Sequence, residues 1–179
     1  MMEKNDFSVV SKWSYYSVDE IPKRANKVDL RTRTATFDDL EMICDYLRRS
    51  ETYESSGKTY VNSWRWEPLD LYSGILADLI RNKRVLVIGK YNKIRGLAII
   101  NKDNKYSGSN HTFQIVYLDA PDVSVLKDII RFAINLVHSG DEIYDRIQVY
   151  SPQTTYVSAV MLEVGMKKSE QFLLYKREI

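Results

Sequence analysis

The sequence predicts an α/β (α+β) domain with a mixed, mainly antiparallel central sheet flanked by helices. Two apolar strands, 84–90 and 94–100, flank the short turn Tyr91-Asn-Lys93, which is typical of an antiparallel hairpin. A strand at 111–118 is followed by a helical pattern at 123–139 and by another strand at 146–150. A helix of this length between two strands predicts a right-handed parallel crossover. The hairpin and the crossover together make the sheet mixed.

Composition sets the first limits on function. The 179 residues contain 26 Lys and Arg against 24 Asp and Glu, a balance that does not predict binding to nucleic acid. No apolar run approaches the roughly 18–20 residues needed to span a bilayer, so we expect no membrane insertion. The first residues lack the pattern of a signal peptide, and Cys44 is the single cysteine. We therefore expect a cytoplasmic protein without an intrachain disulfide, and the sequence indicates no metal site.

The N-terminal third begins with a segment that is hard to assign. Residues 1–28 contain apolar and aromatic side chains without a sustained period, and we expect them to form an arm that packs onto a domain of residues 29–179. Residues 28–34 alternate and predict the first strand of that domain. Thr36 and Asp39 then form a capping-box pattern before a helix whose apolar stripe places Cys44 on the buried face.

Residues 50–68 are polar and aromatic and predict a loop. Within it, Trp64 and Trp66 flank an arginine and precede Glu67 and a proline. Two interpretations stay open: the rings pack on the core, or they line a substrate pocket in which Glu67 meets a cation. Later patterns predict helices at 69–82 and 154–164, the second ending at Gly165, and a final strand at 171–177.

This order of elements resembles the GNAT superfamily of N-acetyltransferases. The likeness spans residues 28–179 and lies in the opening strand and helix 30–40, in the hairpin 85–100 with Gly96 near the start of its outward strand, and in Met161-Leu-Glu-Val-Gly-Met166. The last stretch looks like the family's closing "Leu-Tyr-x-x-x-Gly-Phe". The resemblance implies a GNAT-like domain that transfers an acetyl group from acetyl-CoA, as co-substrate, to an amine.

The resemblance also implies roles for particular residues. Backbone N–H groups of Tyr117 or Leu118 would polarise the thioester carbonyl, and Glu67 would accept the proton of the amine, with His111 and Gln114 on the central strand as other candidates for the base. The position of the family's general acid, a tyrosine, is Met161 here, so Tyr156 or Ser158 on the same helix would substitute for it. Trp64, Trp66 and Glu67 would bind the amine. Backbone amides at the start of the helix would hold the pyrophosphate of coenzyme A; they belong to Val123, Ser124, Val125 and Leu126.

The turn before that helix departs from the family pattern. The family has Arg/Gln-x-x-Gly-x-Gly/Ala there, whereas this chain has Asp119-Ala-Pro-Asp122 and no glycine from His111 to Ser139. We expect both aspartates to put negative charge beside the helix N-terminus, with Asp122 as its cap. Met161 occupies the position where many members carry a tyrosine.

These departures keep alternatives open. One is a non-catalytic binding module that kept the fold and lost the cofactor site. Another is nucleic-acid binding through a few scattered basic residues, which are more typical of a solvated surface. If the chain is an enzyme, the acceptor is a small-molecule or peptide amine, such as a polyamine, a lysine or an N-terminal amine. A homodimer is compatible with the sequence.

Overall fold

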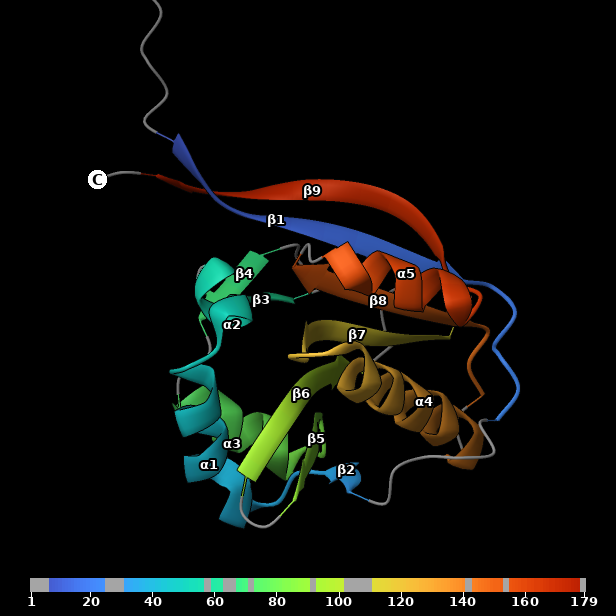
Figure 1. Cartoon of the computed structure of the whole chain (residues 1–179), viewed down its shortest axis with the longest axis horizontal. Helices are drawn as coiled ribbons and strands as arrows, with labels where there is room; N and C mark the ends of the chain where they lie inside the picture. The colour runs from blue at the N-terminus through green and yellow to red at the C-terminus, as the bar shows by residue number, and fades with distance from the viewer. Residues whose placement is uncertain are drawn as a thin grey trace, which may run out of the picture.

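A seven-stranded sheet runs through the molecule in the order β2-β5-β6-β7-β8-β1-β9 (Figure 1). The structure is a computed structural model that describes residues 7–24, 31–56, 59–62, 67–70, 73–90, 93–101, 111–140, 143–152 and 155–177. Its strands are β1 (Phe7–Val18), β2 (Thr32–Thr34), β5 (Val85–Lys90), β6 (Lys93–Asn101), β7 (Thr112–Asp119), β8 (Arg146–Pro152) and β9 (Lys167–Arg177). A separate two-stranded sheet joins β3 (Thr59–Asn62) and β4 (Glu67–Asp70).

Helices lie on both faces of the large sheet (Figure 1). One face packs against α1 (Leu40–Leu47) and α3 (Ser73–Arg81), and the other against α4 (Val123–Ser139) and α5 (Thr155–Glu163). A 3-10 turn (Phe37–Asp39) precedes α1, and the short helix α2 (Glu51–Ser55) follows it. Among the described helices, none is both long enough and apolar enough to cross a membrane.

The predicted fold class is confirmed. β5 and β6 form the antiparallel hairpin, and β7 and β8 are parallel, joined by α4. Every other pair of neighbouring strands described in the large sheet is antiparallel, so the sheet is mixed and mainly antiparallel. The capping box is present as well, because the backbone N–H of Thr36 donates to Asp39 Oδ2 at 2.8 Å.

The N-terminal segment differs from the arm that we expected. Phe7–Val18 forms β1, which lies inside the sheet and is antiparallel to both β8 and β9. Trp13 and Tyr16 are buried on opposite faces of the sheet, Trp13 beside the ring of Tyr117 and Tyr16 against Ser158 of α5. Both faces of β1 are therefore covered at Trp13–Tyr16, which removes there the polar–apolar alternation that identifies a strand in a sequence, whereas Val9 and Lys12 are exposed.

Three boundaries also differ from the prediction. The expected loop 50–68 contains α2 and β3, and β4 takes up residues 67–70, so α3 begins at Ser73 rather than at residue 69. The final strand begins at Lys167, four residues before the predicted start at 171. The helix before it ends as predicted, since Gly165 has φ of +86° and its N–H donates to the carbonyl of Leu162.

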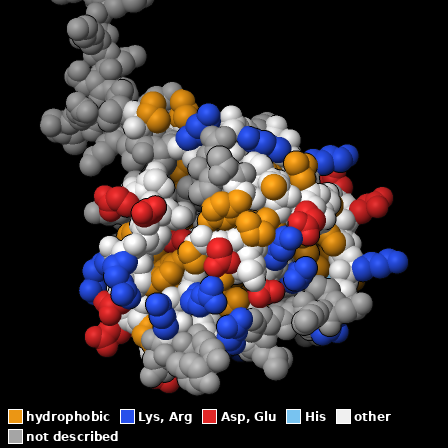
Figure 2. Space-filling model, viewed as in Figure 1, with side chains coloured by type: hydrophobic (Ala, Val, Ile, Leu, Met, Phe, Trp, Pro, Cys, Tyr) orange, Lys and Arg blue, Asp and Glu red, His pale blue; other side chains and the backbone are white. Residues whose placement is uncertain are grey.

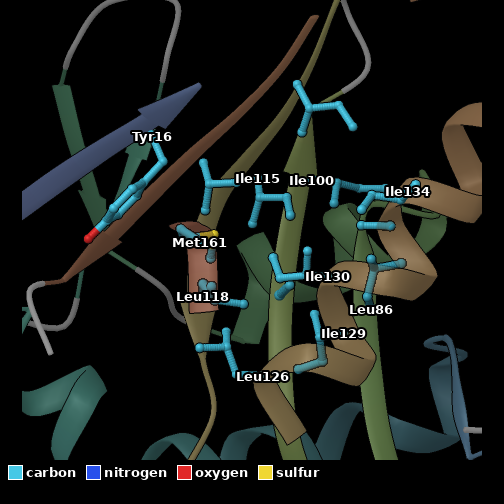
Figure 3. Close-up of a cluster of buried hydrophobic side chains, with 14 of the residues drawn as sticks. Tyr16, Leu86, Ile100, Ile115, Leu118, Leu126, Ile129, Ile130, Ile134 and Met161 are labelled. Carbon is cyan, nitrogen blue, oxygen red and sulfur yellow. The ribbon is translucent and has the colours of Figure 1, made fainter. Parts of the chain in front are cut away.

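Helix α4 packs closely on the sheet because β6 carries a glycine beneath it. Figure 3 shows apolar side chains of α4 directed toward side chains of β5 and β6. A Cβ on Gly96 would lie 2.5 Å from Val125 Cγ1 and 2.9 Å from both Ile129 Cδ1 and Ile88 Cγ2. Gly96 therefore sets the distance at which the first turns of α4 cross the sheet.

We expect Gly96→Ala to destabilise the protein by about 1–3 kcal/mol, because the added methyl group overpacks this contact. Chemical denaturation measures the change. Gly140→Ala is the matched control: this residue is exposed at the end of α4 with φ of −87°, which any residue adopts. Equal stabilities of the two variants would contradict the close approach of α4 at Gly96.

Candidate functional site

The ends of β7 and β8 separate. The two strands pair from Thr112–Ile115 against Arg146–Val149, and no further pair forms in the described residues, although β7 continues to Asp119 and β8 to Pro152. Helix α4 follows β7, and α5 follows β8. Ligands of α/β proteins bind at the carboxyl ends of parallel strands, so this opening is the candidate site. A small void at the opening is lined by Leu118, Ala120, Leu126, Ser151, Tyr156, Val157 and Thr52.

A buried carboxylate lies at the end of β7. Asp119 is 3% exposed, and hydroxyl groups on three neighbouring residues donate hydrogen bonds to its oxygens. Tyr46 of α1 donates to Oδ1 at 3.0 Å, Tyr117 of β7 donates to Oδ2 at 3.1 Å, and Ser50 donates to Oδ2. Burial disfavours the charged form and raises the pKa of Asp119, while the hydroxyl donors act in the opposite direction.

The same charge affects the two tyrosines. Burial, and then the negative charge of Asp119, raise the pKa values of Tyr46 and Tyr117 well above the ordinary range. Both phenols therefore stay protonated and act as hydrogen-bond donors at neutral pH. The carboxylate of Asp119 therefore keeps these two hydrogen-bond donors over the whole physiological pH range.

An open groove leads from the surface to Asp119. Its volume is about 760 Å³, and its walls come from the end of α1, from α2, from the start of β6 and from the turn after β7. Tyr156 of α5 lines both this groove and the void between β7 and β8. Its hydroxyl donates to the backbone carbonyl of Ala120. Tyr156 thus lies where the groove meets the strand opening.

The start of α4 bears one of the two predicted negative charges. Asp122 caps the helix, as predicted, because its Oδ1 accepts from the N–H of Val125 at 2.9 Å. Asp119 does not lie there, since it points to the opposite face of the sheet, toward Tyr46. The remaining charge of Asp122 is paired with Arg95 at 3.1 Å. The local charge at this helix end is therefore more nearly balanced than the sequence indicates.

The backbone amides of the first turn are only partly available to a ligand. Val125 donates to the side chain of Asp122, and Leu126 donates to its carbonyl at 3.1 Å. In the described part of the chain, the amides of Val123 and Ser124 have no acceptor. Of the four amides expected to hold a pyrophosphate, these two remain, while the side chains of Val125 and Leu126 belong to the core.

The other predicted site residues are dispersed. Trp64 and Trp66 lie outside the described residues. The backbone of Glu67 pairs with Asn62 in the small sheet, but its side chain is outside the described part. The hydroxyl of Ser158 forms a hydrogen bond of 2.7 Å with Tyr16, which places it against β1. Leu118 is buried and lines the void.

Asp119 is the functional candidate that the sequence analysis missed, since it considered this residue only as an unfavourable charge. Its position as the last residue of a buried strand at the ligand-binding edge is the signal that could have found it. Among the described residues, no cluster of three or more His, Cys, Asp and Glu side chains is arranged to hold a metal ion.

Similar folds occur among solved structures. A GNAT-family acetyltransferase from Colwellia psychrerythraea aligns with a TM-score of 0.61 and 9% identity, over 94% of this chain and 56% of that protein. A putative GNAT-family acetyltransferase from Novosphingobium aromaticivorans aligns with a TM-score of 0.61 and 10% identity, over 100% of this chain and 71% of that one. The chain has the GNAT fold. No protein-family model and no curated protein sequence matches it.

A third solved structure extends this likeness. It is a conserved protein of unknown function from Enterococcus faecalis, described as a probable N-acyltransferase, with a TM-score of 0.61 and 12% identity over 96% of this chain. This chain spans 40% of that protein and 56% of the Colwellia protein. At these identities the likeness establishes the GNAT fold alone.

We expect the stability difference between the parent and Asp119→Asn to depend on pH. Because the pKa of Asp119 is raised in the folded state, the folded protein binds this proton more tightly than the unfolded chain does. This tighter proton binding stabilises the folded state. The stabilisation is fully present below 3.8, the ordinary pKa of an aspartate, and it is lost as pH rises through the raised pKa of Asp119 in the folded protein. Denaturant unfolding from about pH 3 to about pH 7 should show the parent losing stability relative to the variant.

Asp39→Asn is the control of opposite sign. Arg33 donates to both oxygens of Asp39, at 2.5 and 2.6 Å, and this bond lowers the pKa of Asp39. Here the parent should gain stability relative to the variant as pH rises through the lowered pKa toward 3.8. A parent-to-Asp119→Asn difference that does not vary with pH would contradict the raised pKa.

Proposed function

We propose that this protein transfers an acetyl group from acetyl-CoA to an amine, with Asp119 accepting the proton of the attacking amine. The observation that carries the proposal is the buried carboxylate at the end of a groove, beside the opening between β7 and β8 of a GNAT fold. An amine is protonated at neutral pH and must lose a proton before its lone pair can attack a carbonyl. A carboxylate whose pKa is raised by burial is a better base than an exposed one.

The residues on the two faces of β7 would have different roles. Side chains alternate along a strand, so Leu118 and Ala120 face α4 and α5, while Asp119 faces α1 and the groove. The acceptor would enter through the groove and place its nitrogen near Asp119. The main chain of Tyr117 or Leu118, beyond the last β7–β8 pair, would donate to the carbonyl oxygen where charge develops.

Bond changes at the site then balance. Acetyl-CoA supplies the acetyl thioester, and the amine nitrogen forms the new bond to its carbonyl carbon while the carbon–sulfur bond breaks. Asp119 takes one proton from the ammonium group. The hydroxyl of Tyr156, at the junction of groove and opening, protonates the departing thiolate. The second proton that the nitrogen loses as the amide forms would return to the Tyr156 oxygen through solvent, and Asp119 would release its proton to solvent, so that the products are the amide, the free thiol of coenzyme A and one proton. Glu67, the base expected from the sequence, stays a prediction, and Asp119 is preferred because its carboxylate lies in the groove.

The residues at the start of α4 fit the co-substrate only in part. The amides of Val123 and Ser124 are available to a phosphate oxygen, and Arg95 lies at the cap. The glycine-containing turn of the family is absent, and Asp122 occupies the amide of Val125. These features favour weaker pyrophosphate contacts than the family signature provides. They are also the observations that support the alternative, a GNAT-fold binding module without catalysis.

Asp119→Asn should lower kcat for amine acetylation by about 10²–10⁴-fold, because the variant has no proton acceptor at this position. Release of coenzyme A from acetyl-CoA, followed over a panel of amines, measures the rate. Asp45→Asn, on the exposed surface of α1, is the matched control and should retain the parent rate. Acetylation that persists at the parent rate in Asp119→Asn would remove Asp119 from the mechanism.

Tyr156→Phe tests the general acid separately. The change removes one hydroxyl and keeps the ring that fills the space between α5 and the end of β7. We expect kcat to fall by about 10–10²-fold with the KM for the amine nearly unchanged, because the hydroxyl acts on the leaving group. Tyr15→Phe is the control, because the ring of Tyr15 packs on Tyr150 and does not line the groove. Equal rates in both variants would exclude Tyr156 as the acid.

A further inference from the structure

We infer that the acceptor carries an anionic group, a carboxylate or a phosphate, in addition to the amine that is acetylated. This inference rests on the proposed function and specifies its substrate class. The observation that supports it is a set of cations along the groove that ends at Asp119: Arg49, Lys93 and Arg95 all line its walls.

One of these cations lies close to the carboxylate. Leu97 of β6 pairs with Asp119, which brings the start of β6 beside the end of β7. The pairing of β6 with β5 shifts between Gly96 and Ile94, and this bulge breaks the alternation of side chains: Ile94 is buried with Leu97, and Arg95 lies at the bulge and lines the groove. The Tyr46 hydroxyl joins the two positions, with 3.0 Å to Asp119 Oδ1 and 3.5 Å to the carbonyl of Arg95.

The cations are available for a ligand to different degrees. Within the described part of the chain, neither Arg49 nor Lys93 forms an ion pair. Arg49 donates through Nε to the backbone carbonyl of Asp45 at 3.0 Å, which holds the base of its guanidinium at the end of α1. Arg95 shares its charge with Asp122 across 3.1 Å, and both side chains are 45% exposed. A ligand anion would therefore meet Arg49 and Lys93, which form no ion pair with the described residues, and Arg95, which already pairs with Asp122.

The charges of the groove disfavour a purely cationic acceptor. Three basic side chains line it, against the carboxylates of Asp119 and Glu51 and that of Asp122, which pairs with Arg95. Asp119 is buried and would be engaged by the ammonium group, which leaves three basic side chains against two carboxylates in the outer part of the groove. A polyamine would bring further positive charge to that part, whereas a carboxylate or phosphate would form charge-assisted hydrogen bonds there. Elsewhere on the face shown in Figure 2, basic and acidic side chains are interspersed.

The test uses pairs of amines that differ only in the anion. β-Alanine is compared with β-alaninamide, and phosphoethanolamine with ethanolamine, with spermidine as the polycation. We expect the anionic member of a pair to have the higher kcat/KM, by about tenfold or more. In Arg49→Gln and Lys93→Gln that preference should fall about tenfold, with the KM for acetyl-CoA unchanged. Arg48→Gln, the exposed neighbour outside the groove, should keep the preference.

Three results would overturn the inference. One is equal turnover within each pair, and another is a preference for spermidine. The third is a raised KM for acetyl-CoA in Lys93→Gln and Arg49→Gln, because the cations would then bind the phosphates of the co-substrate.

A binding measurement separates this inference from the proposed function. Calorimetric titration of the amine pairs is performed without acetyl-CoA. If no amine is acetylated, the proposed function fails, yet the anionic subsite still predicts that phosphoethanolamine binds and that Lys93→Gln weakens this binding about tenfold. Equal binding of phosphoethanolamine and ethanolamine to the parent would overturn the subsite, whatever the activity.

Discussion

The hydrogen bonds to the Asp119 carboxylate are the interaction on which the site depends. A buried carboxylate is tolerated only when its oxygens are satisfied, and here the donors come from α1, from the residue that caps α2 and from β7 itself. These hydroxyls fix the end of α1 and the start of α2 against the last residue of β7. The groove wall and the carboxylate are therefore positioned by the same set of bonds.

The opposite face of β7 is organised by packing rather than by polar contacts. Gly96 allows the first turns of α4 to approach the sheet, so that Val125 and Leu126 are buried while Val123 and Ser124 stay at the surface. On the same side, Lys127 of α4 pairs with Glu163 of α5 at 2.7 Å. The two helices that flank the strand opening are thus linked to each other as well as to the sheet.

Much of this architecture could be predicted from local patterns. The hairpin, the central strand, α4 with its Asp122 cap and the parallel crossover all have signals within a few residues of each other. Strand β1 has no such signal, because its middle part is buried on both faces and its partners lie more than a hundred residues away. The start of α3 was misplaced because Leu69 and Asp70 join the helical pattern in the sequence but pair with β3 in the structure.

The site could be predicted less well than the fold. Tyr156 was predicted because its helix resembles the closing helix of the family; it lines the groove, and its role stays a prediction. Asp119 was interpreted as a charge beside α4, since the sequence alone does not tell on which face of the turn the carboxylate lies. Three hydroxyls from residues 46, 50 and 117 define that face, and their convergence on one carboxylate is a property of the tertiary structure. The cations of the groove are likewise distant in sequence from the carboxylate they accompany.

The central claim is that this GNAT fold still binds acetyl-CoA, despite the altered turn before α4. Calorimetric titration of the parent protein with acetyl-CoA tests it most directly. The account predicts saturable binding in the micromolar range, with weaker binding of free acetate or of dephosphorylated fragments that cannot engage the start of α4. An absence of binding heat at millimolar acetyl-CoA would contradict the account and favour a GNAT-fold module that acts without this co-substrate.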